Sequence, residues 1–213
     1  NLIFLRKKYK SSYQSIFFSN LNQIKNRLKD KKIDYFINFA TLYKNSHRHN
    51  EITKFIDANV IFPTIVLDAI FPKVKRIINF GTMMQHLDGK NYYPKNFYAS
   101  TKSAFEMIMN YYTTKNKSLK FYNLKFYESF SEEDYRKKLI PQLLRNHKKN
   151  CYTKIISKNL ELNVIHLEDI VNSISLVLNK KIKSGTYCLI NKKNIKIDKL
   201  IKNINNKSKK KIK

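Results

Sequence analysis

A tyrosine and a lysine stand four residues apart in the segment Tyr98-Ala-Ser-Thr-Lys102, and together they can perform acid–base chemistry on a carbonyl group. Apolar residues recur at helical spacing from Phe97 to Tyr112, so a helix is predicted there, and residues four apart share one face of it. An ammonium beside a phenol lowers the phenol pKa from its usual value of about 10. The same spacing arises by chance in a chain with 14 tyrosines, where it marks only an amphipathic helix with a solvated lysine.

A third reactive side chain comes from the segment before this helix, Arg76-Ile-Ile-Asn-Phe-Gly-Thr82. A short apolar run of this kind is typical of a buried parallel strand, with Thr82 at its carboxyl end. Open α/β sheets bind their ligands at that edge. Thr82 is therefore expected at a ligand-binding edge, and the helix that carries Tyr98 follows after a loop.

Strand-like and helix-like segments alternate along the chain, which predicts an α/β fold with a parallel sheet. The strands are expected at residues 2–6, 15–18, 35–40, 76–81, 121–127, 163–167 and 186–190. The helices are expected at residues 20–31, 51–69, 96–116, 132–148, 167–179 and 196–204. Pro63 falls inside the second helix and should kink it or mark a second start.

The chain carries a formal net charge of +28, with 43 Lys and Arg against 15 Asp and Glu. Only six of these basic residues are arginine, the residue on which nucleic-acid readers depend for bidentate contacts. Lysine, asparagine and isoleucine share A/T-rich codons, so genomic base composition explains the excess equally well. Specific nucleic-acid binding is therefore not expected, although the charge would attract an anionic substrate such as a nucleotide diphosphate.

Three further features of the sequence concern membrane association, the redox compartment and metal binding. No apolar run reaches the ~18 residues of a membrane span, and no signal peptide is visible, so no membrane association is expected. Cys151 and Cys188 lie far apart, which favours unpaired thiols in a reducing compartment such as the cytoplasm. His47 and His49 have a metal-like spacing but no further ligand nearby, and no metal site is expected.

The order of a strand-end hydroxyl, a loop and a Tyr-x-x-x-Lys helix resembles the catalytic core of the short-chain dehydrogenase/reductase superfamily. Its extended branch, the NAD-dependent epimerase/dehydratase family of sugar-nucleotide enzymes, is the more similar. Three other segments resemble this branch in the right order: 34–41, 57–63 and 162–171. The resemblance implies a Rossmann-like, doubly wound parallel sheet in residues 1–127. It also implies a small substrate-binding lobe in residues 128–213, with strand 163–167 returning to the main sheet.

The resemblance implies a role for each reactive side chain. Tyr98 would exchange a proton with the substrate oxygen, Lys102 would acidify Tyr98 and hold the cofactor ribose, and Thr82 would hydrogen-bond the same substrate oxygen. Asn59 would help to order the site, although a helical asparagine can also cap a break before Pro63.

A nicotinamide cofactor, NAD or NADP, follows from the same resemblance. Ala40 and Thr41 end the strand that lies beside the cofactor in the family. Arg6 stands where NAD-preferring relatives usually carry an acidic residue, and an arginine there can pair with the 2′-phosphate of NADP. We hypothesise NADP preference from Arg6, against the alternative of a solvated arginine at a strand end.

The chain departs from the family at the glycine-rich turn that holds the cofactor pyrophosphate. Its three glycines, Gly81, Gly89 and Gly185, form no such motif. The segment that begins at Asn1 resembles the second strand of the family, so the first strand, glycine loop and first helix are expected to be missing. Their absence would leave a slot between strands 2–6 and 35–40.

The residues after Thr82 bear on the reaction type. Sugar-nucleotide dehydratases of this branch follow the threonine with an Asp-Glu pair, whereas this chain has Met83 and Met84. The segment is more similar to the CDP-abequose/paratose synthase group, which reduces a 4-keto-dideoxyhexose. By that likeness, His86, Arg136 and Lys138 are candidate substrate contacts, with solvated positions as the alternative for each.

The expected function is therefore NAD(P)H-dependent reduction of a nucleotide-linked 4-keto-deoxyhexose, for surface polysaccharide sugar biosynthesis. NAD-dependent epimerisation of a nucleotide sugar uses the same residues and stays open. A truncated, non-catalytic remnant that serves as a basic interaction module is the alternative from another class. A homodimer is possible, since relatives commonly pair through the helix that carries the tyrosine.

Overall fold

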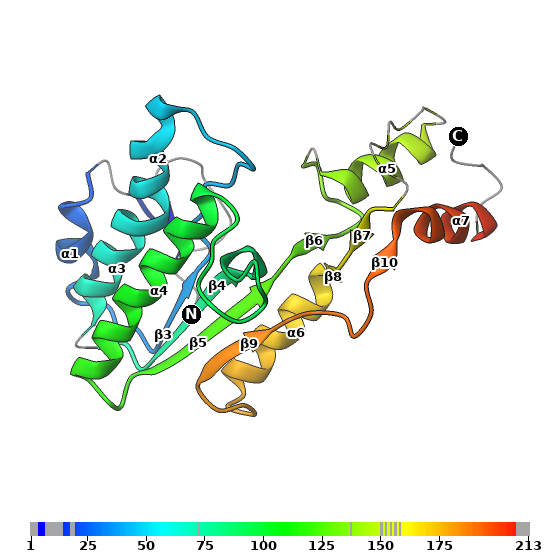
Figure 1. Ribbon diagram of the computed structural model, residues 1–213. Coiled ribbons are helices and arrows are strands. Elements are labelled where there is room, and N and C mark those ends of the chain that lie inside the picture. The colour runs from blue at the N-terminus through cyan, green and yellow to red at the C-terminus, as the bar shows by residue number, and fades with distance from the viewer. Residues whose placement is uncertain are drawn as a thin grey trace. The chain divides into compact units, whose positions relative to one another are not determined.

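The computed structural model describes residues 4–6, 15–17, 20–71, 73–136, 138–149, 151, 153, 155, 157 and 159–207 (Figure 1). The chain divides into two compact units. The first comprises residues 1–125 and 183–187, and the second comprises residues 126–182 and 188–213. The main boundary thus lies two residues before the expected one, and a short later segment returns to the first unit.

A four-stranded parallel sheet forms the centre of the first unit. Its strand order is β3 (Tyr35–Asn38), β4 (Arg76–Thr82), β5 (Lys120–Phe126) and β9 (Gly185–Cys188). Strands β3 and β4 run parallel, with Tyr35 opposite Arg76 and Asn38 opposite Asn79. Ile77 and Ile78 of β4 are fully buried, which explains why this strand is a continuous apolar run in the sequence.

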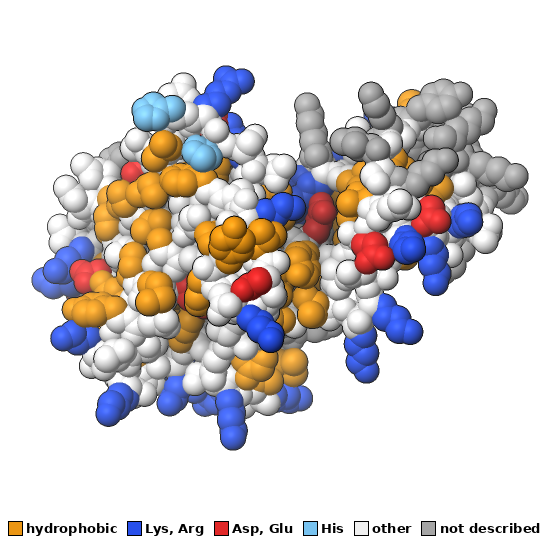
Figure 2. Space-filling model, viewed as in Figure 1, with side chains coloured by type: hydrophobic (Ala, Val, Ile, Leu, Met, Phe, Trp, Pro, Cys, Tyr) orange, Lys and Arg blue, Asp and Glu red, His pale blue; other side chains and the backbone are white. Residues whose placement is uncertain are grey.

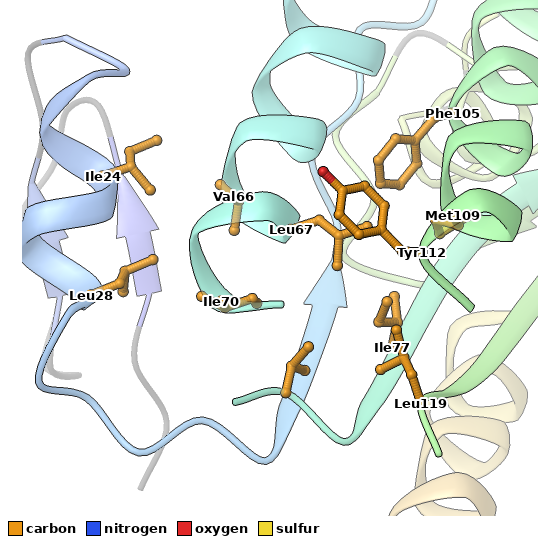
Figure 3. Packing of buried hydrophobic residues seen from close by; sticks show 11 residues of the cluster. Ile24, Leu28, Val66, Leu67, Ile70, Ile77, Phe105, Met109, Tyr112 and Leu119 are labelled. Atoms are coloured by element: carbon orange, nitrogen blue, oxygen red, sulfur yellow. The ribbon is translucent and has the colours of Figure 1, made fainter. Parts of the chain in front are cut away.

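Helices α3 (Phe62–Ile70) and α4 (Phe97–Lys115) cover this sheet, and α1 (Gln23–Leu28) packs against α3. Figure 3 shows their apolar side chains meeting those of the strands in one core. The buried members of that core are Ile24, Leu28, Val66, Leu67, Ile70, Val74, Ile77, Phe105, Met109, Tyr112 and Leu119. The same packing fixes α4 against the sheet, and α4 is the helix that carries Tyr98 and Lys102.

The expected long helix at 51–69 is observed as an uninterrupted helical segment from Ile52 to Ile70, with a π-helical turn before Pro63. Helix α2 (Ile52–Ile56) passes into a π-helical turn, Asp57–Ile61, and α3 then begins with Pro63 in its first turn. Proline lacks the N–H that a helix interior needs but suits a helix start. The helical backbone continues through Pro63, so no second start is present, and a kink at Pro63 stays a prediction.

Strands β1 (Phe4–Arg6) and β2 (Ser15–Phe17) form a separate two-stranded parallel sheet. Within the described residues, neither is hydrogen-bonded to β3, which forms an edge of the four-stranded sheet. The slot expected between the segments 2–6 and 35–40 stays a prediction.

The second unit contains two small sheets and three helices. Strand β6 (Glu128–Phe130) pairs in parallel with β8 (Val164–His166), and β7 (Glu161–Leu162) pairs antiparallel with β10 (Ile195–Lys196). The helices are α5 (Leu139–Lys148), α6 (Leu167–Leu178) and α7 (Ile197–Lys207). None of the helices in the described part of the chain has the length and apolarity of a membrane span.

Two expectations for this unit need correction. Strand 163–167 was expected to return to the main sheet, but β8 pairs with β6, and β9 is the late strand that joins the main sheet. The helix expected from residue 132 begins at Leu139. Asp134 explains the delay, because its carboxylate accepts the backbone N–H of Arg136 at 3.0 Å and holds a turn that competes with helix formation.

Candidate active site

Helix α4 carries Tyr98 and Lys102 in its first two turns. Asn96 caps the helix, since its side-chain oxygen accepts the backbone N–H of Ala99 at 2.9 Å. The cap fixes where the helix begins, and Tyr98 and Lys102 then lie one turn apart. The helix packs against β4 and the turn that follows it, and Asn96 and Ser103 of this region contact that turn, so the first turns of α4 lie near the carboxyl end of β4.

Tyr98 contacts the loop that follows β3. Its phenol shares a hydrogen bond with the side chain of Thr41, and the ring of Tyr43 packs edge-on against its ring with centroids 4.9 Å apart. Burial raises the pKa of Tyr98, Thr41 lowers it and Tyr43 raises it further, for a net increase. The expectation that Lys102 lowers this pKa is therefore wrong for this structure, because burial is the dominant effect. The phenol is therefore protonated near neutrality and can act as a hydrogen-bond donor, although its raised pKa makes it a weaker acid than a free tyrosine.

Lys102 is a buried cation, with 2% of its surface exposed. Burial lowers its pKa to about 8, while the carboxylate of Glu106, one turn further along α4, opposes the decrease. Among the described residues, its ammonium has no hydrogen-bond acceptor and no ion-pair partner within 4.0 Å. Burying most of a lysine side chain is costly, and hydroxyl oxygens of a bound ligand would relieve that cost by accepting hydrogen bonds from the ammonium.

Thr82 ends β4 and begins the 3-10 turn Met83–Gln85. Its hydroxyl oxygen accepts the backbone N–H of Met84 at 3.2 Å, while its own backbone N–H donates to the side-chain oxygen of Gln85 at 2.9 Å. These reciprocal bonds form a capping box that holds the Thr82 side chain. The hydroxyl hydrogen has no acceptor in the described part of the chain, so it can donate to an oxygen of a ligand.

Asn59 is fully buried in the π-helical turn and connects two parts of the site. Its side chain accepts the backbone N–H of Leu42 at 2.6 Å and donates to the Leu42 carbonyl at 3.0 Å. It also donates to the hydroxyl of Thr101 on α4 at 2.9 Å. Asn59 therefore ties α4 to the loop that contains Thr41 and makes no helix cap before Pro63.

The remaining cofactor candidates lie at strand ends. Ala40 follows β3, and its backbone N–H donates to the side chain of Asn38 at 3.2 Å. Thr41 lies beside Tyr98, as described above. Arg6 ends β1, and the structure describes its backbone but not its side chain. The roles expected for Ala40, Thr41 and Arg6 in cofactor binding stay predictions.

A ladder of three buried asparagines, which sequence reasoning missed, crosses the sheet beside these strand ends. The Asn38 amide donates to Asn79 at 3.0 Å, and the Asn79 amide donates to Asn123 at 2.9 Å. The three residues come from β3, β4 and β5. The only signal in the sequence is an asparagine inside each of three apolar runs.

His86 was a candidate substrate contact, but both of its ring nitrogens already have partners. Lys125 Nζ lies 2.7 Å from Nε2, and the carbonyl oxygen of Asn91 lies 2.9 Å from Nδ1. The ring also lies against Tyr92, with centroids 4.8 Å apart. Contact between His86 and a substrate stays a prediction, and it would have to use the ring face or replace one of these bonds.

Arg136 and Lys138 belong to the second unit. The Arg136 guanidinium binds the Asp134 carboxylate and the carbonyl and hydroxyl of Ser129, the latter two at 3.0 and 3.2 Å, yet 52% of the side chain is exposed. Lys138 lies 3.9 Å from Glu128. Both side chains are held near the loop after β6, and their contact with a diphosphate stays a prediction.

Comparison with known proteins agrees with this geometry. The model of the NAD dependent epimerase/dehydratase family matches residues 7–190. The chain belongs to this family. It is also 25% identical over 178 residues to CDP-abequose synthase of Yersinia pseudotuberculosis, covering 83% of this chain and 58% of that protein. The chain thus spans somewhat more than half the length of the curated relative.

Solved structures support the same fold for this family member. MoeE5 in complex with UDP-glucose and NAD superimposes with a TM-score of 0.84 at 15% identity, over 99% of this chain and 75% of that one. The UDP-N-acetylglucosamine 4-epimerase of Bacillus cereus gives a TM-score of 0.79 at 20% identity, over 96% and 74% of the two chains. The Rossmann-like α/β fold expected from the sequence is confirmed.

Proposed function

We propose that the natural protein containing this chain is an NAD(P)H-dependent reductase of a nucleotide-linked 4-keto-deoxyhexose. The observation that carries the proposal is the pair of hydroxyl donors beside the edge of β4, the protonated phenol of Tyr98 and the hydroxyl of Thr82. Two such donors suit a ketone oxygen, which becomes more negative during reduction. Because Met83 and Met84 follow Thr82, this stretch supplies no acid/base pair for elimination of water.

The side chains have separate tasks in this proposal. Thr82 donates a hydrogen bond to the ketone oxygen, and Tyr98 transfers its proton to the same oxygen as the hydroxyl of the product forms. The hydrogen bond from Thr41 then stabilises the phenolate of Tyr98, consistent with the lowering effect of Thr41 on the pKa of Tyr98. Solvent returns the proton to Tyr98 after the product leaves.

The residues of the site fit a nicotinamide cofactor at Lys102. Its buried ammonium has no acceptor among the described residues, and the two hydroxyls of a ribose would supply acceptors. When bound, NADH or NADPH supplies the hydride for the reduction. NADP preference, based on Arg6, belongs to this proposal and is tested by comparing the affinities of the protein for NADPH and NADH.

Figure 2 shows how the basic side chains are distributed on one face of the molecule. On the visible face of the first unit, Lys and Arg side chains lie at separate points and form no continuous basic stripe. A basic groove that follows the phosphate backbone is the usual footprint of nucleic-acid binding. Scattered positive charge still favours the approach of a nucleotide diphosphate.

The decisive experiment measures reduction of a nucleotide-linked 4-keto-6-deoxyhexose by the natural protein, with NAD(P)H followed by its absorbance and the product by NMR. A reductase consumes one NAD(P)H for each product formed. Conversion without net cofactor consumption would instead show an epimerase. Tyr98→Phe should abolish turnover while sparing cofactor affinity, because it removes only the phenol oxygen, and Tyr111→Phe on the exposed face of α4 is the matched control. Full activity of Tyr98→Phe would contradict the proposal.

A further inference from the structure

Two opposite charges are buried beneath the candidate site. Lys125 of β5 and Glu106 of α4 lie 3.0 Å apart, with 2% and 4% of their side chains exposed. Glu106 also accepts a hydrogen bond of 2.8 Å from the side-chain amide of Gln85. Taking two charges out of water costs several kcal/mol per ion, and only good geometry with further hydrogen bonds offsets it. An apolar pair would pack at least as well, so the pair is expected to serve a purpose besides stability.

Gln85 connects this ion pair to Thr82. Its side-chain amide donates to Glu106, and its side-chain oxygen accepts the backbone N–H of Thr82 at 2.9 Å. The same amide nitrogen lies 3.2 Å from the hydroxyl of Ser103 on α4. The position of Thr82 relative to α4 is therefore fixed by two consecutive buried hydrogen bonds, from Thr82 to Gln85 and from Gln85 to Glu106.

Lys125 connects the ion pair to the segment that follows Thr82. Its ammonium lies 2.7 Å from Nε2 of His86 and 4.8 Å from the centre of the Tyr92 ring. Tyr92 in turn shares a hydrogen bond with Glu106. Glu106 and Lys125 thus both hold the loop from His86 to Tyr93, which lies between Thr82 and Tyr98 in the sequence.

These contacts determine the protonation of the His86 ring. An ammonium has only donors, so Nε2 must accept the hydrogen bond from Lys125 and carries no proton. The carbonyl of Asn91 has only acceptors, so Nδ1 must donate and carries the proton. His86 is therefore neutral and is held in the Nδ1–H tautomer.

We propose that Glu106, Lys125 and Gln85 form a positioning unit that fixes Thr82 and the His86 loop against α4, with His86 as a neutral hydrogen-bond acceptor for Lys125. The unit acts on Thr82 and the loop through hydrogen bonds, and its Glu106 also favours the charged form of Lys102. This inference rests on the proposed function for its effect on catalysis. The protonation of His86 does not depend on that function.

The first test is therefore spectroscopic and needs no turnover. In the 15N NMR spectrum of the labelled chain at neutral pH, the two ring nitrogens of His86 should show the pattern of the Nδ1–H tautomer, with Nε2 far downfield. The chain has five histidines, so His86→Gln identifies the signals. Lys125→Met should change the His86 pattern, because Nε2 loses its donor, while Lys120→Met at an exposed position on the same strand should leave it unchanged. A charged ring or an Nε2–H tautomer in the unaltered chain would overturn the proposal.

Lys125→Met leaves Glu106 buried without its partner and can reduce stability enough to prevent folding. The double variant with Glu106→Gln and Lys125→Met removes both charges and should fold, since losing a buried pair together is far less costly than losing one partner. In this double variant the carbonyl of Asn91 still holds the proton on Nδ1, but the Nε2 signal of His86 should shift, because this nitrogen loses its hydrogen bond. An unchanged Nε2 shift in the folded double variant would contradict the assignment of Lys125 as the donor.

The second test uses the natural protein and separates positioning from binding. The double variant should lower kcat by about tenfold to a hundredfold, because small displacements of reacting groups have effects of this size, with a much smaller change in KM. Lys125→Arg, which keeps a donor for Nε2 and a charge for Glu106, should recover part of the loss. Unchanged kcat in the double variant would refute the positioning role. If the unaltered protein shows no reductase activity but the His86 signals are as expected, the proposed function fails and the protonation of His86 stands.

Discussion

The side-chain amide of Asn59 donates a hydrogen bond of 2.9 Å to the hydroxyl of Thr101, which lies 42 residues further along the chain. The bond joins the π-helical turn to α4, and the same amide is bonded to Leu42 in the loop beside Tyr98. A π-helical turn places a side chain off the regular helical pattern and is frequent at functional sites. Here it directs Asn59 to both segments that surround Tyr98.

Replacing Asn59 with alanine should therefore loosen the site as well as the fold. Asn59→Ala leaves the partly buried backbone groups of Leu42 without their side-chain partner, and the free energy of unfolding should fall by about 1–2 kcal/mol. Urea unfolding measures this loss. Asn110→Ala on the exposed surface of α4 is the control and should change stability by less than about 0.5 kcal/mol. Equal stability of the two variants would show that the hydrogen bonds of Asn59 make no net contribution to the free energy of unfolding.

The burial of Lys102 makes a prediction about pH. Its folded-state pKa of about 8 lies below its usual value of 10.5, so the folded chain binds fewer protons between these two values. The stability penalty is therefore complete below about pH 8 and declines as the pH rises toward 10.5. Lys102→Met should stabilise the free chain by up to about 3 kcal/mol at pH 7, and this gain should shrink across the same range.

Unfolding curves at several pH values measure the effect of Lys102→Met, and Lys120→Met at an exposed position is the control. In the proposed reductase, Lys102→Met should also weaken NAD(P)H binding, since it removes the donor for the ribose hydroxyls. A variant that is more stable and less active is the expected result of removing a strained functional group. A loss of stability at pH 7 would mean that Lys102 has a partner that stabilises its charge.

The position before Thr82 has no room for a side chain, which explains why it is Gly81. A Cβ at this position would lie 2.8 Å from both the Lys125 Cγ and the Gln85 side-chain oxygen. Gly81→Ala must therefore displace the positioning unit, and it should cost about 1–3 kcal/mol of stability. Gly89→Ala is a useful comparison, because Gly89 has φ +78° but no atoms near its absent Cβ. That variant should carry only a backbone cost of about 1–2 kcal/mol.

Local patterns in the sequence predicted the elements that carry Tyr98 and Thr82. The apolar run before Thr82 and the helical period from Phe97 to Tyr112 correspond to β4 and α4 within a residue or two. Both signals are local, because a buried strand and an amphipathic helix each produce a recognisable spacing of apolar residues within a short stretch of sequence. The start of α5 was misplaced because a side-chain bond at Asp134 is decided by geometry that composition does not reveal.

The contacts that depend on the alignment of distant strands were not predictable in the same way. A lysine in an apolar strand usually indicates an exposed position. Lys125 is nevertheless buried, and its charge is paired with Glu106 on α4, a contact that the sequence does not reveal. The pKa of Tyr98 was predicted in the wrong direction because the sequence shows the nearby Lys102 but not the extent of burial. Pairing between strands 41 and 44 residues apart likewise decides the asparagine ladder.

That ladder supplies a last prediction. Asn79→Asp keeps the acceptor for Asn38 but replaces the donor to Asn123 with a second oxygen, so at pH 7 it places a buried carboxylate against a carbonyl oxygen. The loss of stability should be at least about 3 kcal/mol. Because the buried carboxyl has a raised pKa, the folded state holds its proton, and the difference from the unaltered chain should shrink as the pH falls toward about 4. Asn110→Asp on the surface of α4 should show no such dependence, and a pH-independent difference for Asn79→Asp would mean that the ladder admits water at this position.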